Sequence, residues 1–172
     1  MIFVYGAIAS GKSEYAESLA LSLGGERVYL ATMEVSDKED LLRVQKHRAL
    51  RAGKGFRTIE RSRNICEAEI DAGELVLLEC LSSLLAAEMF CGGRAKKPEE
   101  VEKKIHHDII KLNQKCRELI IVGSDISREN AVYEEGVNAY IQVLLSLQKK
   151  LCAIAESREI VCGLEASESK KQ

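Results

Sequence analysis

The chemistry of this chain begins near its start, where two glycines, a lysine and a serine follow a short apolar run. Four residues separate Gly6 from Gly11, and Lys12 and Ser13 follow directly, which is the Walker A spacing. Glycines here let the backbone wrap around an anion with its N–H groups inward, while the lysine ammonium reaches the outer phosphates. We therefore expect a cradle for a nucleoside triphosphate. The alternative is a glycine turn that matches the pattern by chance.

The whole loop is expected to contribute to this cradle, because its backbone amides face the phosphates. The expected nucleotide-binding residues are Gly6, Ala7, Ile8, Ala9, Ser10, Gly11, Lys12 and Ser13. The apolar run before the loop favours a buried strand, and the apolar stripe after it favours a helix whose N-terminus adds its positive dipole end. Strand, loop and helix are thus all predicted.

A second chemical group stands at the end of the most apolar strand candidate, 75–80, which reads LVLLEC and contains Glu79. A carboxylate there is costly unless it is paired or lies at the carboxyl edge of the sheet, where open α/β sheets place their ligands. In nucleotide-using folds with such a cradle, an acidic residue in this position reaches Mg²⁺. We expect Ser13 and Glu79 to hold the metal; the alternative is an acidic strand cap without one.

A third constellation is a histidine within a basic helix. Arg43, His47 and Arg51 are spaced four residues apart and share one helical face, with Lys46 and Arg48 adjacent. The surrounding positive charge should lower the pKa of His47 and keep its ring neutral and nucleophilic. A neutral imidazole can attack the α-phosphorus of a bound triphosphate, and the arginines would absorb the charge of the departing pyrophosphate. The alternative is a solvated basic helix with one exposed histidine.

The elements that must position these groups alternate between short apolar strands and longer helices. The predicted strands are 2–5, 27–31, 56–60, 75–80, 119–123 and 159–162, and the predicted helices are 13–23, 39–51, 63–72, 82–90, 99–117 and 132–156. This order indicates an α/β fold: a single P-loop NTPase-like domain with a mostly parallel sheet and helices on both faces. Residues 1–164 are expected to form the nucleotide-binding transferase domain, and 165–172 a polar, frayed tail.

Composition limits the classes of function. With 172 residues, 46% of them hydrophobic and 30% charged, the chain suits one globular domain, and its net charge of −2 offers no general attraction to nucleic acid or anionic membrane. We predict a cytoplasmic protein without stable membrane insertion, because the chain has no long apolar run and begins with a strand. The six cysteines contain no C-x2-C pair, which argues against structural zinc.

Several motifs, in order along the chain, resemble one known family. They are Gly6-Ala-Ile-Ala-Ser-Gly-Lys-Ser13, Tyr29-Leu-Ala-Thr32, Arg43-Val-Gln-Lys-His-Arg48, Arg51, Thr58-Ile-Glu60 and Leu77-Leu-Glu-Cys80. Together they resemble the bifunctional adenosylcobinamide kinase/adenosylcobinamide-phosphate guanylyltransferase family of cobalamin biosynthesis. The resemblance is closest over residues 1–90. Ala7 and Ala9 differ from the family's usual glycine and arginine, and Phe56 replaces its usual tryptophan.

The resemblance implies two reactions, phosphorylation of the aminopropanol hydroxyl of adenosylcobinamide and then transfer of GMP from GTP to that phosphate. It implies GTP and/or ATP as substrates with Mg²⁺, a guanylyl group carried on His47, and a homo-oligomer, in this family a trimer. It also implies that Glu60 contacts the guanosine and that Arg43, Arg48 and Arg51 stabilise phosphate charge.

Three other functions remain open on the sequence. One is a single-activity P-loop kinase acting on a small molecule, in which His47 only binds phosphate, and another is a guanylyltransferase of the same family. The third is a non-catalytic nucleotide-binding regulator, suggested by departures from the family pattern after Ser124. A DNA-acting ATPase is disfavoured, since no long basic or aromatic face is apparent.

Overall fold

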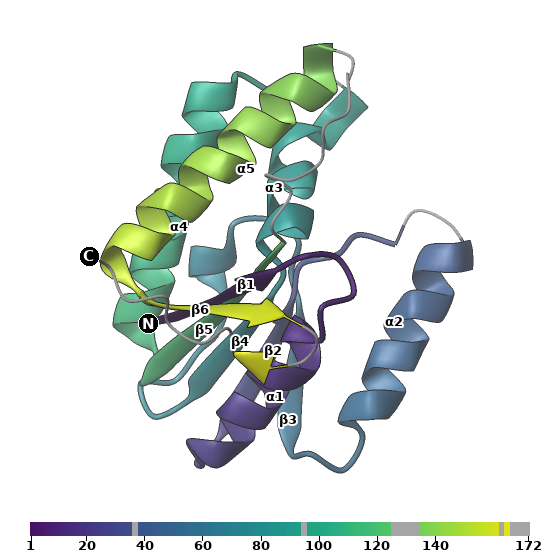
Figure 1. Ribbon diagram of the computed structural model, residues 1–172, viewed down its shortest axis with the longest axis vertical. Helices are drawn as coiled ribbons and strands as arrows, with labels where there is room; N and C mark the ends of the chain where they lie inside the picture. Colours follow the sequence, from purple (N-terminus) through teal and green to yellow (C-terminus); the bar gives the residue numbers. More distant parts are fainter. Residues whose placement is uncertain (36–37, 94–95, 125–134, 162–163, 166–172) are drawn as a thin grey trace.

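A computed structural model describes residues 1–35, 38–93, 96–124, 135–161 and 164–165 of the chain (Figure 1). Strands and helices alternate along most of its length. The strands are β1 (Ile2–Gly6), β2 (Arg27–Ala31), β3 (Phe56–Glu60), β4 (Leu75–Glu79), β5 (Glu118–Ser124), β6 (Glu156–Val161) and β7 (Leu164–Glu165). The helices are α1 (Lys12–Ser22), α2 (Lys38–Arg51), α3 (Leu81–Met89), α4 (Pro98–Lys115) and α5 (Glu135–Ile154), with short 3-10 turns η1 (Ile65–Glu67) and η2 (Cys91–Gly93).

The described strands form one sheet in the order β3-β2-β4-β5-β1-β6-β7. The first six run parallel, and β7 pairs antiparallel with β6. The central strands β4 and β5 are apolar along nearly their whole length because helices cover both of their faces. Since parallel strands share one carboxyl edge, the loop after β1 and the acidic end of β4 meet there.

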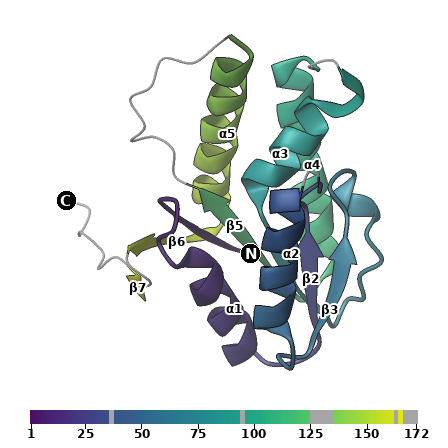
Figure 2. The ribbon, with the colours of Figure 1, turned by 90° about the vertical axis from the view of Figure 1, so that its right-hand side faces the viewer.

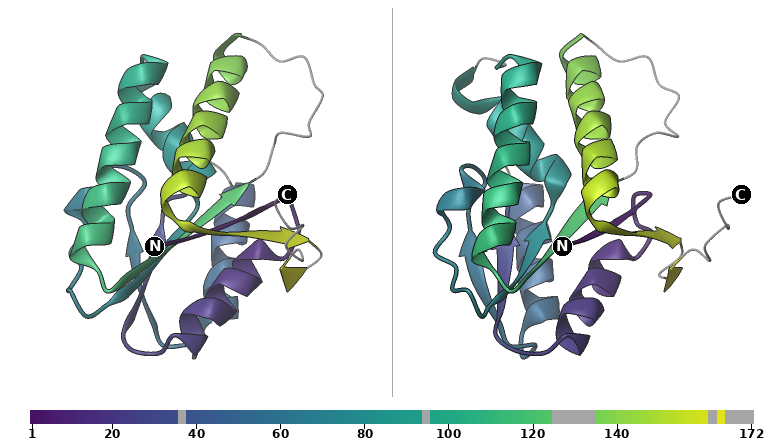
Figure 3. Two further views of the ribbon diagram at one scale, coloured as in Figure 1. Left: turned by 60° about the vertical axis from the view of Figure 1, so that its left-hand side comes forward. Right: turned by 90° about the vertical axis from the view of Figure 1, so that its left-hand side faces the viewer.

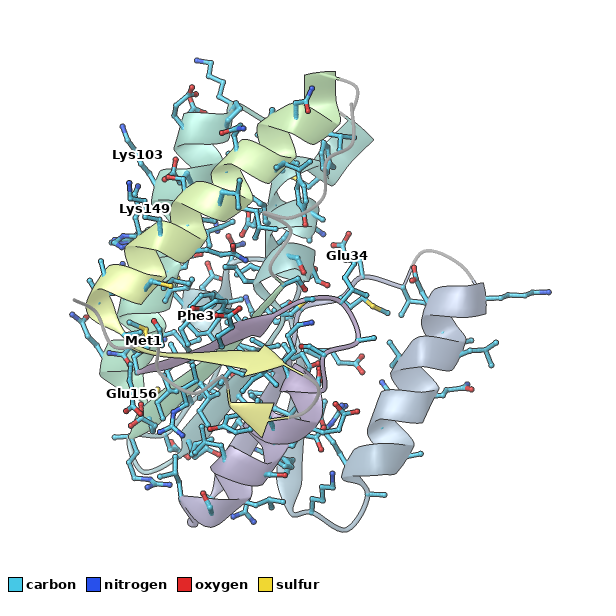
Figure 4. All side chains as sticks on the ribbon, in the orientation of Figure 1. Met1, Phe3, Glu34, Lys103, Lys149 and Glu156 are labelled. Atoms are coloured by element: carbon cyan, nitrogen blue, oxygen red, sulfur yellow. The ribbon has the colours of Figure 1, made fainter. Side chains whose placement is uncertain are left out.

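Two apolar layers hold the sheet between helices. On one face α3, α4 and α5 pack on a core around Phe3, Leu85 and Ile109, and Figure 4 shows Phe3 deep inside the molecule. On the other face α1 packs through Ala16 and Ala20. Figure 3 shows α4 and α5 together on their side of the sheet. The two layers fix the sheet from both sides, so the loop between β1 and α1 is carried by rigid elements.

Helix α2 stands apart from the other helices in the view of Figure 1, and Figure 2 views the molecule from the side on which α2 lies. The turn after it is tied to α1 by an ion pair of 2.5 Å between Lys54 Nζ and Glu17 Oε2. Gly53 and Gly55 in this turn have φ values of 79° and 71°, which glycine adopts without strain. The chain therefore reverses sharply from α2 into the edge strand β3.

Most predicted elements are confirmed, with boundaries within a few residues. The edge position of the 56–60 strand, the buried strand at 75–79 and the long helix that begins at Pro98 are all observed. The start of the predicted helix 132–156 lies outside the described residues. That helix ends at Ile154, because Glu156 already pairs with Ile2 in the sheet, so the last predicted strand begins three residues earlier than expected.

The predicted helix at 63–72 is wrong, since only the short turn η1 forms there. Asn64 lies in the left-handed region at φ 50°, and Ala68 is extended at ψ 139°. Side chains from other elements hold the backbone of this segment in its non-helical course: Asn64 N donates to Glu88, and the carbonyls of Cys66 and Glu69 accept from Lys115 and Arg57. Tertiary hydrogen bonds thus override the local helical preference.

The last part of the chain contains a strand that the sequence pattern did not indicate. The two residues of β7 pair with Ile160 and Val161 of β6. Of the predicted frayed tail, Glu165 belongs to β7, and 166–172 lie outside the described residues.

Candidate active site

The phosphate loop is shaped by unusual backbone angles between β1 and α1. Gly11 precedes α1 with φ 84°, and Ala9 has φ 58°, a conformation that a non-glycine residue seldom adopts. Ser10 N donates to Ala7 O at 3.2 Å and closes a tight turn. Ile8, at the tip, is 70% exposed. The loop is thus preformed around the N-terminus of α1, where an anion is favoured.

Lys12 lies inside this loop rather than in solvent. Its ammonium donates to the carbonyl of Ala7 at 3.0 Å, and the residue is only 9% exposed. Burial lowers the pKa of Lys12, an effect that the nearby Cys80, Glu79 and Glu14 partly offset. A buried ammonium that donates to a backbone carbonyl is well suited to a polyanion, because phosphate oxygens would accept the hydrogen bonds that water can no longer accept.

The predicted metal pair is brought together from positions 66 residues apart. Ser13 Oγ donates to Glu79 Oε1 at 2.5 Å. The other oxygen, Oε2, accepts a hydrogen bond of 2.9 Å from the hydroxyl of Tyr29. A hydroxyl beside a carboxylate offers the hard oxygen ligands that Mg²⁺ prefers, so these residues fit the expected ion.

A pocket of about 810 Å³ opens between the end of α2 and the edge strand β3. Its size lies within the range of small-molecule sites. The lining residues are Arg48, Arg51, Ala52, Gly53, Gly55, Phe56, Thr58 and Glu60. Phe56, Thr58 and Glu60 are alternate residues of β3, and they face this space together because successive side chains of a strand point to opposite faces of the sheet. Three of the predicted nucleotide-binding residues, Arg48, Arg51 and Glu60, lie together here.

The two arginines of this pocket differ in environment. Arg48 is exposed and forms an ion pair with Glu60. Arg51 is only 7% exposed, and its guanidinium carbon lies 3.4 Å from the centre of the Tyr29 ring. Among the described residues, no hydrogen-bond partner is found for Nε and Nη1 of Arg51. Buried donors without partners are costly, which suits a site that binds an anion or another acceptor.

Two predicted site residues cannot be placed by their contacts. The backbones of Arg43 and His47 belong to α2, but their side chains lie outside the part that the structure describes. His47 precedes Arg51 by one helical turn and is next to Arg48 in sequence. The proposed nucleophile is thus carried by the helix whose last turn lines the pocket.

Two residues of the site had no role in the sequence interpretation. Tyr29 contacts both Glu79 and Arg51, and the fully buried Thr32 donates to the carbonyl of Cys80 at 2.8 Å. Both belong to the segment Tyr29-Leu-Ala-Thr32, which was noted only as a family motif. The available signal was chemical: a buried tyrosine or threonine hydroxyl needs a partner, and such partners stand at the ends of neighbouring strands.

These features define the class of the protein. A strand, a glycine-containing phosphate loop, a helix that starts at the loop lysine, and an acidic residue at the end of a neighbouring parallel strand make it a P-loop NTPase-like α/β protein. Within the described residues, no helix combines the length and apolar character required to cross a lipid bilayer.

Comparison with known proteins identifies the family. The model of the cobinamide kinase / cobinamide phosphate guanyltransferase family matches residues 2–167, and the chain belongs to this family. The chain is 34% identical over 125 residues to the bifunctional adenosylcobalamin biosynthesis protein CobU of Escherichia coli, covering 68% of each. It is 30% identical over 146 residues to the CobU protein of Salmonella typhimurium, covering 76% of this chain and 80% of the relative.

A third relative covers about half of the chain. The bifunctional adenosylcobalamin biosynthesis protein CobP of Pseudomonas aeruginosa is 34% identical over 91 residues, which is 51% of this chain and 52% of the relative. The family consists of kinases and guanylyltransferases of cobalamin biosynthesis. The protein is therefore a transferase, and the predicted family resemblance is confirmed.

Proposed function

We propose that the protein phosphorylates the aminopropanol hydroxyl of adenosylcobinamide and then transfers GMP from GTP to that phosphate, giving adenosylcobinamide-GDP. The observation that best supports this is the combination of two sites in one domain. One is a triphosphate cradle with the Ser13–Glu79 pair, and the other is a pocket with the buried Arg51, whose Nε and Nη1 have no hydrogen-bond partner among the described residues, on the helix that bears His47.

In the kinase step, Lys12 and the loop amides hold the triphosphate through its outer phosphates. The hydroxyl oxygen of the corrinoid forms a bond to the γ-phosphorus and gives up its proton to solvent, while the bond to the β,γ-bridging oxygen breaks and a nucleoside diphosphate leaves. Mg²⁺ held by Ser13 and Glu79 would neutralise charge that develops on the phosphates. The ammonium of Lys12, which lies inside the loop, would stabilise the same negative charge.

In the guanylyl step, a ring nitrogen of His47 forms a bond to the α-phosphorus of GTP, and pyrophosphate leaves as the bond to the bridging oxygen breaks. A phosphate oxygen of the phosphorylated corrinoid then attacks the same phosphorus, and the P–N bond breaks. The Nε and Nη1 donors of Arg51, which have no partner within the described part of the chain, would stabilise the phosphate charge, and Arg43 and Arg48 add positive charge along the same helix. Glu60 would contact the guanosine, and the nearby Phe56 ring offers a face for stacking.

The test is a covalent label. The protein is incubated with GTP labelled at the α-phosphate and with Mg²⁺, and the denatured protein is examined for label that is labile in acid and stable in base. We expect label on the wild type and on His107→Ala, an exposed histidine of α4, but none on His47→Ala. An unlabelled wild type would overturn the guanylyl-histidine.

A second assay separates the two activities. Phosphorylation of cobinamide by a wild type that takes no label would leave a kinase alone. Nucleotide binding without turnover of either kind would instead support a regulator. The homo-oligomeric state, expected to be a trimer, is tested independently by light scattering of the full chain. The expected cytoplasmic location is tested by cell fractionation.

A further inference from the structure

Tyr29 lies between the two halves of the candidate site. It is in the middle of β2, is 4% exposed, and has its hydroxyl and its ring engaged with different partners. The hydroxyl donates to Glu79 Oε2 at 2.9 Å, and the ring lies 3.4 Å from the guanidinium carbon of Arg51. One side chain thus contacts the acidic residue of the cradle and the buried arginine of the pocket.

The hydroxyl of Tyr29 and that of Ser13 divide the two oxygens of Glu79 between them. Ser13 and Tyr29 bind different oxygens of that carboxylate, so Tyr29 holds Oε2 and leaves Oε1 facing the serine. Without the hydroxyl, rotation of the carboxylate about its last torsion would be less restricted. Hydrogen-bond partners behind a metal-binding carboxylate commonly determine its orientation.

The ring controls Arg51 in a different way. The stacking contact uses the flat face of the guanidinium, whereas its N–H donors lie in the plane of the group. Nε and Nη1 accordingly remain without partners among the described residues. Stacking on Tyr29 therefore holds the arginine in place without using the donors that an anion in the pocket would need.

Tyr29 makes two separate contacts, the hydrogen bond from its hydroxyl to Glu79 and the stack of its ring on Arg51, and each can be removed by a different substitution. A phenylalanine would keep the stack and lose only this hydrogen bond, whereas a leucine would lose both contacts.

We propose that Tyr29 is a positioning residue that orients the Glu79 carboxylate through its hydroxyl and the Arg51 guanidinium through its ring. The inference rests on the proposed function in one respect, that Glu79 and Arg51 each bind part of a nucleotide. It does not require that the protein turn over a substrate. Its consequences can therefore be measured as binding, independently of catalysis.

The hydroxyl is tested with Tyr29→Phe by calorimetry with GTP, with and without Mg²⁺. We expect binding without metal to match the wild type, and binding with Mg²⁺ to weaken by about 10-fold or more, the usual effect of losing an outer partner of a metal ligand. Tyr140→Phe removes the hydroxyl of another, half-buried tyrosine, which donates to Ser82 O at 3.1 Å, and should bind like the wild type. Equal weakening of Tyr29→Phe with and without metal, or none, would overturn the role of the hydroxyl.

The ring is tested with GMP alone as the probe of the pocket. Tyr29→Phe should retain wild-type GMP affinity, whereas Tyr29→Leu should weaken it about 10-fold by loss of the stacked contact. Arg51→Lys keeps the charge, cannot stack as a flat group, and should weaken GMP to a similar extent, which keeps the test valid if Tyr29→Leu does not fold. Wild-type GMP affinity in Arg51→Lys, or no GMP binding by the wild type, would overturn the role of the ring.

These outcomes are separable from failure of the proposed function. A wild type that takes no covalent label and does not phosphorylate cobinamide would refute the proposed reactions. The metal-dependent difference for Tyr29→Phe and the GMP difference for Arg51→Lys would still stand as properties of nucleotide binding.

Discussion

Gly6 connects the end of β1 with both the phosphate loop and the neighbouring strand β6. A methyl group at this position would lie 2.4 Å from the backbone oxygen of Ile160 and 2.7 Å from Ser10 Oγ. The first of these atoms belongs to the backbone of the sheet and cannot easily move. The requirement for glycine at this position is therefore steric.

We predict that Gly6→Ala lowers the free energy of unfolding by about 3 kcal/mol, the upper part of the range for overpacking. It should also weaken nucleotide binding, because the loop must shift to relieve the contact. Chemical denaturation and calorimetry with GTP measure the two effects. Gly73→Ala is the matched control, since a methyl group there meets nothing within 4 Å. Equal stability of the two variants would contradict the steric argument.

Lys12 is the residue whose charge the cradle depends on most directly. Lys12→Met keeps the side-chain length and removes the ammonium, so we expect GTP affinity to fall by about 10- to 100-fold, the effect of losing one or two charge-assisted hydrogen bonds. Lys103→Met, an exposed lysine that points away from the molecule in Figure 4, should bind GTP as the wild type does. Titration calorimetry distinguishes these outcomes, and unchanged affinity in Lys12→Met would exclude the cradle.

At the scale of elements, α4 is attached to its neighbours by buried charge as well as apolar contacts. Lys104 Nζ lies 2.5 Å from Glu88 Oε1 of α3 and 2.7 Å from Asp108 Oδ2 of its own helix. Both carboxylates are almost completely buried. Desolvation opposes the charge of Lys104, but its hydrogen bonds to Asp108 and Glu88 prevail and raise its pKa.

We predict that Lys104→Met destabilises the fold by about 3 kcal/mol, because it leaves two buried carboxylates without their shared cation. Adding Asp108→Asn should restore part of the loss, since one of the two charges is then removed. Lys103→Met on the same helix should change the free energy of unfolding little. Urea denaturation of the wild type, the two single variants and the double variant gives the comparison. If Lys104→Met lost no more stability than Lys103→Met, the prediction would be refuted.

An ion pair also joins helices α4 and α5. Glu102 accepts from Lys150 and from Ser146 Oγ, with Oε1 at 2.6 and 2.5 Å from the two donors. The hydrogen bond from Lys150, then that from Ser146, holds the pKa of Glu102 below its ordinary value of 4.5. The folded state therefore binds fewer protons at this group than the unfolded state does near that pH.

This depressed pKa predicts a pH-dependent stability. Relative to Glu102→Gln, the wild type should gain about 1 kcal/mol above the unfolded pKa, and the gain should disappear as the pH falls through the lower folded pKa. Denaturation of both proteins between neutral and strongly acidic pH measures the difference. Glu69→Gln, at an exposed position, should track the wild type throughout. If the stability advantage of the wild type over Glu102→Gln grew as the pH falls, the prediction would be wrong.

At the scale of the whole molecule, the site is assembled where the carboxyl ends of the parallel strands meet. The cradle lies after β1, Glu79 ends β4, and Tyr29 of β2 reaches from the neighbouring strand toward α2. A ligand at this edge contacts elements from most of the first half of the chain. Its binding free energy consequently adds to the stability of the complete fold.

We expect Mg²⁺ and GTP, at about 100 times the dissociation constant, to add about 2.7 kcal/mol to the stability of the folded protein. For a domain of this size, that corresponds to a rise in Tm of roughly 5–10 °C. Thermal denaturation followed by circular dichroism measures it, and Lys12→Met should show a much smaller rise. An unchanged Tm in the wild type would mean that Mg²⁺ and GTP do not bind the folded protein more tightly than the unfolded chain.

The sequence by itself was sufficient for the parts of the protein that depend on neighbours along the chain. The spacing from Gly6 to Ser13 is local, so it indicated the cradle, and the apolar run 75–79 indicated a buried parallel strand. The rule that such strands share a carboxyl edge was enough to predict that Ser13 and Glu79 meet, which the 2.5 Å hydrogen bond confirms. These features depend on backbone geometry and periodicity, which a short segment specifies.

Only the tertiary structure decided the rest, because it depends on partners that are distant in sequence. The 63–72 segment has helical residue types, yet Lys115, Arg57 and Glu88 hold its backbone in a non-helical course. The basic spacing on α2 did not reveal that Arg51 is buried on the ring of Tyr29 while Arg48 is exposed and paired. That difference arises because the last turn of α2 places Arg51 over Tyr29 of β2 and Arg48 next to Glu60 of β3, and no pattern within the helix records which of its arginines will meet an aromatic ring.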